Sequence, residues 1–322
     1  MFQKAIIYMT NNSIQWFPGH MHKARKKIEE VIPKVDIIIE VLDARIPFSS
    51  QNPLIHHICK NKLVIKILNK RDLADPEMTA FWLSHLEKKQ GVKAMAITTR
   101  QISEVNRIIA LCRKFTPHYE EIGKQIFTMI MGIPNVGKST IINILAGSVV
   151  AQTGNQPAVT RQQQRINLQN SLVLLDTPGI LWSKVENPYS SFRLAATGAI
   201  KDTAMKYDEV AFYIVKYLVK AYPEFLKKRY NIEVLPETDI ELMTTIGEKR
   251  GCLRSGGRID LHKASEILIN DLRNGMLGRI TFEHPKMIDD ELIHAEEAAR
   301  KKTEEKAKVK EERRKRYLRN KR

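Results

Sequence analysis

Apolar residues in the first half of the chain occur at two spacings, which predicts alternating strands and helices. Runs rich in β-branched residues, typical of buried parallel strands, occur at 35–42, 62–68, 92–97 and 126–131. Helical spacing of apolar residues occurs at 76–89, 105–112 and 141–146. Two shorter runs, 166–168 and 172–175, predict a hairpin. The alternation predicts a doubly wound, mostly parallel α/β sheet.

The pattern changes near residue 188, beyond which only helices are predicted. Helical spacing fills 208–220, 223–230, 240–249 and 261–274. We therefore expect a flexible leader at 1–13, an α/β domain at 14–190, an all-helical domain at 191–285 and a basic charged tail at 286–322. The tail from Glu291 to Arg322 has 13 Lys and Arg, seven Asp and Glu and no Gly or Pro. This composition predicts either an exposed charged helix or a disordered arm.

The sequence GIPNVGKST, from Gly132 to Thr140, lies between a predicted strand and a predicted helix, which is the context of a P-loop. Its backbone N–H groups are expected to converge on phosphate oxygens. Lys138 would reach the β- and γ-phosphates, and Ser139 would place its hydroxyl on Mg²⁺. The residues expected to bind the nucleotide here are Asn135, Val136, Gly137, Lys138, Ser139 and Thr140. The alternative is a glycine turn with a solvated lysine.

Two more motifs agree with a guanine nucleotide. In the sequence NKRD, Asp72 can accept from guanine N1–H and from its exocyclic amine together, Asn69 would brace the loop, and the Lys70 stem would lie along the base. The sequence DTPG ends a predicted strand. Asp176 would hold Mg²⁺ through water, and the Gly179 N–H would face the γ-phosphate. Thr160, in the long polar loop between, is the candidate direct Mg²⁺ ligand.

The order of these motifs is unusual, because the NKRD strand precedes the P-loop whereas in most GTPases it follows. A circular permutation accounts for this order, since strand, loop and helix units can close when the chain ends lie near each other.

Composition narrows the class of partner. The chain has 322 residues, a formal net charge of +17 and an isoelectric point near 9.7, which favour a polyanionic partner, either nucleic acid or an acidic membrane. No apolar run approaches the roughly 18 residues that span a bilayer, so we expect no stable membrane association. Cys59, Cys112 and Cys252 lack the spacing of a metal or disulfide motif and predict reduced thiols in a cytoplasmic protein.

The motifs WFPGHM, DARIP, NKRD, GIPNVGKST, QPAVTRQQQ, DTPG and RGCLRSGGRID together resemble the ribosome biogenesis GTPase A family over about residues 14–283. The resemblance implies a circularly permuted GTPase domain and hydrolysis of GTP to GDP triggered by the large ribosomal subunit precursor during its late assembly. It further implies that the helical domain binds rRNA; no DNA partner is expected. Thr98 and Thr99 occupy the base-side loop, and Asn135 is similar to the asparagine of K⁺-stimulated members.

Ile180 stands where many GTPases have a glutamine that orients the attacking water, so another group must act. The resemblance indicates His20, with Lys138, Thr160 and Gly179 completing the catalytic set; alternatively, His20 only contacts solvent or RNA. The basic residues expected to bind RNA are Lys23, Arg25, Lys26, Lys27, Arg250, Arg254 and Arg258, although such charges often form a solvated face. A second hypothesis is a GTP-gated RNA-binding module in which hydrolysis is incidental.

Overall fold

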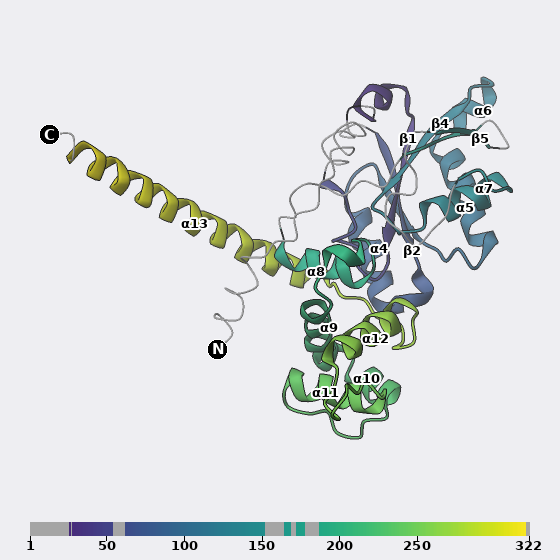
Figure 1. Cartoon of the computed structure of the whole chain (residues 1–322). Helices are drawn as coiled ribbons and strands as arrows, with labels where there is room; N and C mark the ends of the chain where they lie inside the picture. The colour runs from purple at the N-terminus through teal and green to yellow at the C-terminus, as the bar shows by residue number, and fades with distance from the viewer. Residues whose placement is uncertain are drawn as a thin grey trace.

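The computed structural model describes residues 26, 28–53, 62–151, 164–168, 172–177 and 187–319 (Figure 1). One six-stranded sheet, in the order β3-β2-β1-β4-β6-β5, forms the centre of the α/β part. The strands are β1 (Ile37–Asp43), β2 (Leu63–Asn69), β3 (Val92–Ala96), β4 (Ile126–Gly132), β5 (Gln164–Asn167) and β6 (Leu172–Asp176). Neighbouring strands are parallel except β5, which pairs antiparallel with β6 as the predicted hairpin.

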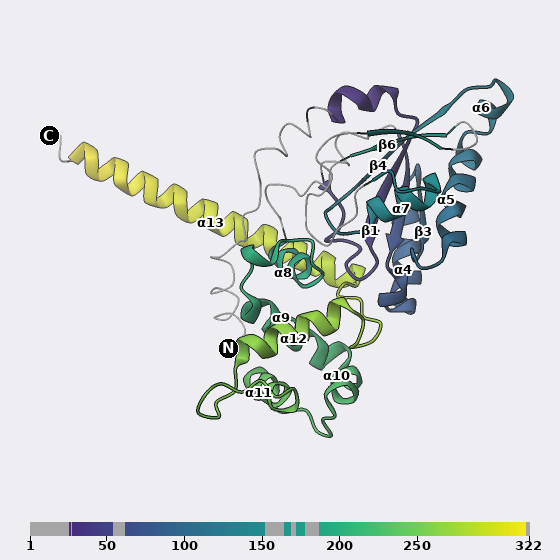
Figure 2. The ribbon, with the colours of Figure 1, turned by 45° about the vertical axis from the view of Figure 1, so that its right-hand side comes forward.

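Helices cover both faces of the sheet, because β1 is buried along its whole length and alternate side chains must pack on opposite sides (Figure 2). Ile37, Ile39 and Val41 belong to the apolar cluster that includes α5 (Ile102–Phe115) and α7 (Lys138–Ala146). Leu42 faces the other side and packs with Trp82 of α4 (Pro76–Glu87). The short helix α6 (Pro117–Glu121) follows α5, and the 3-10 turns η1 (Ile32–Lys34) and η2 (Arg71–Leu73) lie before β1 and after β2.

A group of helices lies beyond the sheet. Its members are α8 (Pro188–Ala196), the 3-10 turn η3 (Asp202–Ala204), α9 (Tyr207–Ala221), α10 (Pro223–Tyr230), α11 (Asp239–Lys249) and α12 (Leu261–Arg273). Helix α9 is central, since its residues Val210, Ile214 and Leu218 are at most 1% exposed and it contacts α8, α10, α11 and α12. Side-chain caps fix two of the helix starts: Thr238 and Glu241 form a capping box on α11, and Asp260 caps α12.

After α12, residues 280–283 contact the α/β part of the chain again before the last helix begins. The Ile280 N–H donates to the Leu73 carbonyl over 3.0 Å, the Phe282 N–H donates to the Arg45 carbonyl over 2.8 Å, and the indole of Trp82 donates to the Glu283 carbonyl over 2.9 Å. Helix α13 (Pro285–Arg319) starts here and projects away from the body (Figure 1). Its helical conformation settles the open question of the tail in favour of a charged helix.

The predicted fold class is confirmed, with every predicted strand present and end positions shifted by one or two residues. Helices α6 and α8 were not predicted. Cys112 and Cys252 are buried and free as expected, whereas Cys59 and the leader at 1–13 lie outside the described residues. Within the described ranges, no helix is both long enough and apolar enough to cross a membrane. The domain boundaries at 190 and 285 stay predictions.

Candidate functional site

The P-loop curls between the end of β4 and the start of α7, and its glycines are required by close approaches. A Cβ on Gly132 would lie 2.5 Å from the carbonyl oxygen of Val41 on the neighbouring strand. Gly137 has φ +96°, and a Cβ there would collide with the side-chain amide of Asn69. The loop therefore fits tightly against β1 and the NKRD loop, as a backbone phosphate cradle must.

Lys138 and Asp176 are buried groups of opposite charge that interact electrostatically at the P-loop. Lys138 is 7% exposed and its Nζ donates to the Ile133 carbonyl over 3.3 Å. Burial lowers the pKa of Lys138 to about 8, opposed by the charge of Asp176. Burial likewise raises the pKa of Asp176 to about 6, opposed by Lys138. Burial has removed water from both charged groups. Binding of an anion at Lys138 and of a cation at Asp176 is therefore favoured.

The environment of Asp176 fits a divalent cation. Both carboxylate oxygens are buried and have no hydrogen-bond partner among the described residues, which is costly without a ligand. Ser139 lies in the first turn of α7, where its hydroxyl is expected to complete a Mg²⁺ site. Within the described chain, no group of three His, Cys, Asp or Glu side chains could hold a metal alone. A cation here would therefore need oxygen atoms of a nucleotide phosphate among its ligands.

The NKRD loop is bound directly to the P-loop. The Asn69 amide donates to the Val136 carbonyl over 2.7 Å, so Asn69 braces the loop as expected. Lys70 adopts a left-handed conformation with φ +61°, and its Nζ donates to the Asn135 carbonyl over 2.7 Å. The Asp72 carboxylate lies 3.3 Å from Nε of Arg100. The predicted base reader is therefore already paired with an exposed arginine.

The loop that carries Thr98 and Thr99 lies beside NKRD. The Ile97 N–H donates to the Leu68 carbonyl over 2.9 Å, and the Arg71 N–H donates to the Ile97 carbonyl over 3.1 Å. Glu104 fastens this corner, because it accepts from the Thr98 N–H and forms an ion pair with Arg71. Two loops that are 25 to 30 residues apart in the sequence are thus brought together, and their role in binding the base stays a prediction.

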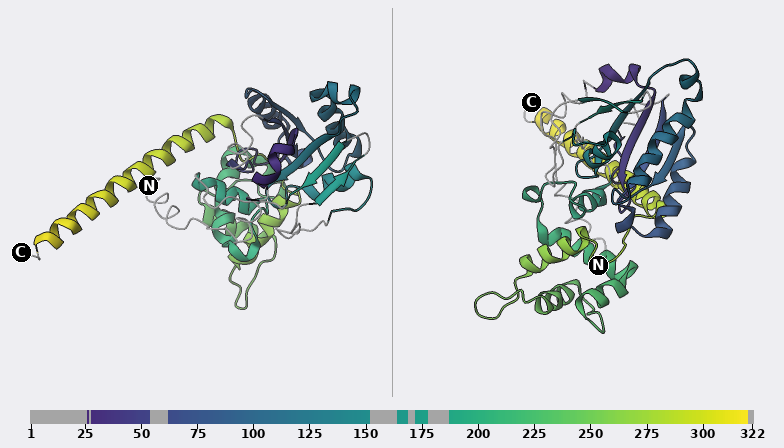
Figure 3. Two further views of the ribbon diagram at one scale, coloured as in Figure 1. Left: turned by 90° about the horizontal axis from the view of Figure 1, so that it is seen from above. Right: turned by 90° about the vertical axis from the view of Figure 1, so that its right-hand side faces the viewer.

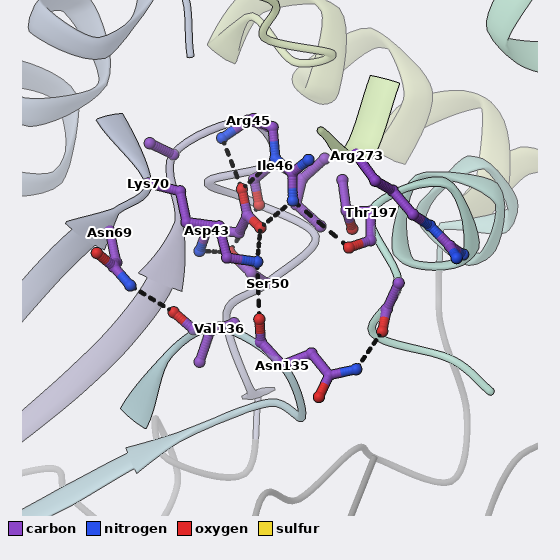
Figure 4. Close-up of polar contacts among 12 residues, drawn as sticks. Asp43, Arg45, Ile46, Ser50, Asn69, Lys70, Asn135, Val136, Thr197 and Arg273 are labelled. Atoms are coloured by element: carbon purple, nitrogen blue, oxygen red, sulfur yellow. Dashed lines mark hydrogen bonds and ion pairs between the residues drawn. The ribbon is translucent and has the colours of Figure 1, made fainter. Parts of the chain in front are cut away.

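Asp43 and Arg45, from the DARIP sequence, form a buried ion pair that sequence reasoning did not place in the site (Figure 4). Their closest N···O distance is 2.7 Å, and Nζ of Lys70 lies 3.1 Å from the same carboxylate. Burial would raise the pKa of Asp43, but Arg45 and Lys70 outweigh it and hold that pKa well below its usual range. Arg45 also donates to the Thr197 carbonyl over 3.4 Å. DARIP was a visible motif, yet its sequence alone indicates no partner.

Asn135 connects the P-loop to the helical part. It has φ +61°, and its side-chain amide donates to the Gly198 carbonyl over 2.7 Å, just beyond α8 (Figure 4). Val136 is buried, whereas Ser139 and Thr140 are half-buried at the start of α7.

The predicted RNA-binding residues have different surroundings. Lys26 is exposed. Arg250 lies 3.6 Å from the Asp271 carboxylate and stacks over the Tyr230 ring at 5.2 Å, so it stabilises the helical packing. Arg254 and Arg258 are exposed on the loop between α11 and α12, where Arg254 pairs with Asp260 over 2.9 Å. The predicted residues His20, Lys23, Arg25, Lys27, Thr160 and Gly179 lie outside the described residues.

Comparisons with known proteins agree with this geometry. Residues 127–235 match the family model described as 50S ribosome-binding GTPase. A protein of Bacillus pumilus (strain SAFR-032) named Ribosome biogenesis GTPase A is 46% identical over 281 residues, which cover 85% of this chain and 99% of that protein. A protein of the same name from Priestia megaterium (strain DSM 319 / IMG 1521) is 45% identical over 288 residues, 87% of this chain and all of that one (100%). The crystal structure of GNP-bound YlqF from T. maritima covers 82% of this chain and 98% of its own, with 25% identity and a TM-score of 0.56.

Proposed function

The chain belongs to the ribosome biogenesis GTPase A family and is a GTPase of ribosome assembly, and from this premise we propose that it acts on the immature large subunit. It binds that particle in the cytoplasm during late assembly, hydrolyses GTP there, and releases itself as GDP forms. The match that carries the proposal runs over 99% of the Bacillus pumilus protein at 46% identity.

GTP binds across the two loops that Asn69 and Lys70 join. Asp72 accepts from guanine N1–H and the exocyclic amine, which adenine cannot satisfy, after releasing or sharing its ion pair with Arg100. Thr98 and Thr99 border the base from the neighbouring loop. The backbone from Asn135 to Thr140 cradles the phosphates, and the helix start at Lys138 adds N–H groups that face an anion.

The bound nucleotide and its metal ion supply the counter-charges that the buried Lys138 and Asp176 lack. Lys138 pairs with the β- and γ-phosphates, which relieves the cost of burying its ammonium group. Ser139, Asp176 and Thr160 would hold Mg²⁺, which would neutralise phosphate charge when bound. Asn135, which is similar to the asparagine of K⁺-stimulated members, would contribute to a K⁺ site, and exchange of K⁺ for Na⁺ in a turnover assay tests this part.

Hydrolysis needs a positioned water, and His20 is the group we assign to it. The residue after DTPG is Ile180, which has no hydrogen-bonding side chain. The N–H of Gly179 completes the contacts to the γ-phosphate, and Thr160 contributes to catalysis as a ligand of Mg²⁺. Binding to the particle through Lys23, Arg25, Lys26 and Lys27 fixes the segment behind His20, so we expect turnover to depend on the particle. Arg254 and Arg258, with Arg250 supporting their loop, contact rRNA from the helical side.

Turnover measured with and without immature large-subunit particles, at fixed salt, tests the proposal. Large stimulation of GTP hydrolysis, followed by dissociation of the GDP-bound protein, is the expected result. If the particle leaves turnover unchanged while GTP still raises affinity for it, the protein is a GTP-gated binding module and hydrolysis does not drive release.

A further inference from the structure

Helix α13 consists of two halves with opposite charge. Residues 285–299 contain five Asp and Glu and one Lys, whereas residues 300–319 contain eleven Lys and Arg and four Glu. The first half is anchored, since Ile288 is 3% exposed and packs with Trp82 and Leu86 of α4. The second half projects beyond the body of the protein (Figure 3). A helix built in this way presents a charged arm on a fixed base.

The base of the arm is held by a buried ion pair. Glu291 accepts from Nη2 of Arg193 over 2.5 Å and from the Asn187 amide over 2.6 Å. Arg193 is 1% exposed and also lies 3.6 Å from Glu283. Asn187 caps α8 and Arg193 is part of it, so the helix that follows the DTPG segment determines the direction of α13.

The lysines and arginines of the distal half are not equivalent. Lys308 has a glutamate at each of the four positions three or four residues away, at 304, 305, 311 and 312, so its charge is balanced within the helix. The ion pair of Arg300 with Glu304, at 3.3 Å, is of the same kind. In contrast, Lys306, Lys310 and Arg313 have no acidic residue three or four positions away. The spacing of four and three residues places these three positions, which we name the basic stripe, on one face of the helix.

We propose that the basic stripe binds the phosphate backbone of duplex RNA in the assembling particle. This inference rests on the proposed function, which supplies RNA as the polyanion. Four residues of helix advance about 6 Å, so the stripe follows a line of successive phosphates rather than a single anion. Lys310 and Arg313 lie in a stretch of exposed residues and are accessible to such a ligand.

The composition of the distal half argues against other occupants. Between 300 and 316 the only large apolar residue is Val309, which is 48% exposed. A membrane-bound helix requires a broad apolar face, and a coiled coil with a second copy requires an apolar residue every three to four positions. Neither pattern is present in this stretch, so charge is the feature that a partner can recognise.

Two variants with the same change in charge test the proposal in the full-length protein. The stripe variant carries Lys306→Gln, Lys310→Gln and Arg313→Gln. The control carries Lys301→Gln, Lys308→Gln and Lys315→Gln on the opposite face. Binding to a 20-base-pair duplex RNA is measured by fluorescence anisotropy at several KCl concentrations. We expect the log–log salt slope of the stripe variant to fall by about 2–3, because each phosphate contact contributes about 0.9. The control should change by less than about 1.

Circular dichroism and basal GTP turnover establish that both variants keep their helix and their nucleotide site; glutamine is a good helix former. Equal slopes for the stripe variant and the unmodified protein overturn the proposal, as does equal weakening in both variants. Stripe-dependent binding to vesicles of anionic phospholipid without stripe-dependent binding to RNA also overturns it. Stimulation of turnover by the particle tests the proposed function separately, so the arm can fail while that function stands.

Discussion

The side-chain amide of Asn135 donates to the carbonyl oxygen of Gly198 over 2.7 Å, and this contact joins the P-loop to the turn that follows α8. On the other side of the same loop, Nζ of Lys70 donates to the Asn135 carbonyl over 2.7 Å. One residue therefore contacts the NKRD loop through its backbone and the helical part through its side chain. A shift of the P-loop on nucleotide exchange would therefore change the contacts with both Lys70 and Gly198.

Asn135→Gly is expected to weaken this communication. Glycine accepts the φ of +61° without strain, so the loop can keep its path while the contact to Gly198 is lost. Hydrogen–deuterium exchange of residues 195–205 should then differ less between the GDP and GTP-analogue states than in the unmodified protein. Asn231→Gly, at a left-handed position with φ +52° far from the site in sequence, is the matched control. An undiminished difference in Asn135→Gly would show that the contact does not transmit the nucleotide state.

Arg45→Gln should lower the free energy of unfolding by about 3–5 kcal/mol, because it leaves the buried Asp43 carboxylate short of its main counter-charge. Chemical denaturation measures this. The double variant Asp43→Asn with Arg45→Gln should be less destabilised than the two single variants summed. If the single effects simply add, the two side chains do not stabilise each other.

The same pair makes an acid-dependent contribution to stability. The pKa of Asp43 is held below its usual value, so the folded state binds fewer protons than the unfolded state near pH 4. The resulting stability is present above that pH and is lost as the pH falls. In Arg45→Gln the decrease in the free energy of unfolding on acidification should therefore be smaller than in the unmodified protein.

Much of the fold was predictable because its signals are local. Strands buried on both faces are continuous apolar runs, and β1, β2 and β4 have that pattern. Helix α8 was missed for a physical reason: it is buried nearly all round, and its buried residues include the polar Ser190 and Arg193, which pair with groups from other segments, as well as Leu194. A helix that buries polar and apolar residues alike does not show the periodic apolar face of a surface helix.

The candidate site also contains features that the local sequence predicts and features that depend on long-range contacts. The P-loop could be predicted because its geometry depends on neighbouring residues. The contact of Arg45 with Thr197 joins positions 152 residues apart, and nothing in either local sequence indicates it. The pairing of Arg250 with Asp271 is also long-range, so an arginine that the sequence offers as an RNA ligand is partly engaged within the protein.

Mg²⁺-dependent GTP affinity is expected to fall below about pH 6. The pKa of Asp176 in the nucleotide-free protein is raised to about 6, and Mg²⁺ binds only the carboxylate. Affinity should decrease by up to about tenfold per pH unit below that value, as one proton is displaced. Protonation of Asp176 itself favours the folded state, because its folded pKa lies above the unfolded one, so titration of this group does not unfold the protein. Asp176→Asn should bind weakly at every pH and show no such slope; an unchanged slope in that variant would exclude Asp176 as the titrating group.

Asp72→Asn should convert the preference from GTP to xanthosine triphosphate. The carboxylate accepts from two donors on guanine, and an amide instead offers a donor that matches the xanthine carbonyl. Competition of both nucleotides against a fluorescent analogue measures the change. Arg100→Gln removes the ion pair at 3.3 Å but keeps the acceptor, so it should retain the preference for GTP. Unchanged GTP affinity in Asp72→Asn would show that another residue reads the base.

His20→Ala should lower particle-stimulated GTP hydrolysis by about 10²–10⁴, the usual cost of losing one positioned acid–base group. His20 follows Pro18-Gly19, a sequence that predicts a turn, and we expect this turn to direct His20 toward the γ-phosphate once the basic segment behind it is held by RNA. Neutral imidazole, with a reference pKa near 6.5, can hold a water at physiological pH. GTP affinity should change little, because Lys138 and the P-loop backbone bind the phosphates.

The His20→Ala protein should therefore load GTP, bind the immature subunit and remain there, which a sedimentation assay with single-turnover hydrolysis can show. His22→Ala removes an imidazole two residues further along and should hydrolyse normally, which separates catalysis from a general effect on the segment. Loss of particle binding in His20→Ala would instead assign this residue to RNA contact. Normal hydrolysis on the particle would leave Thr160, or a group supplied by the particle, as the source of the positioned water, since Ile180 cannot provide it.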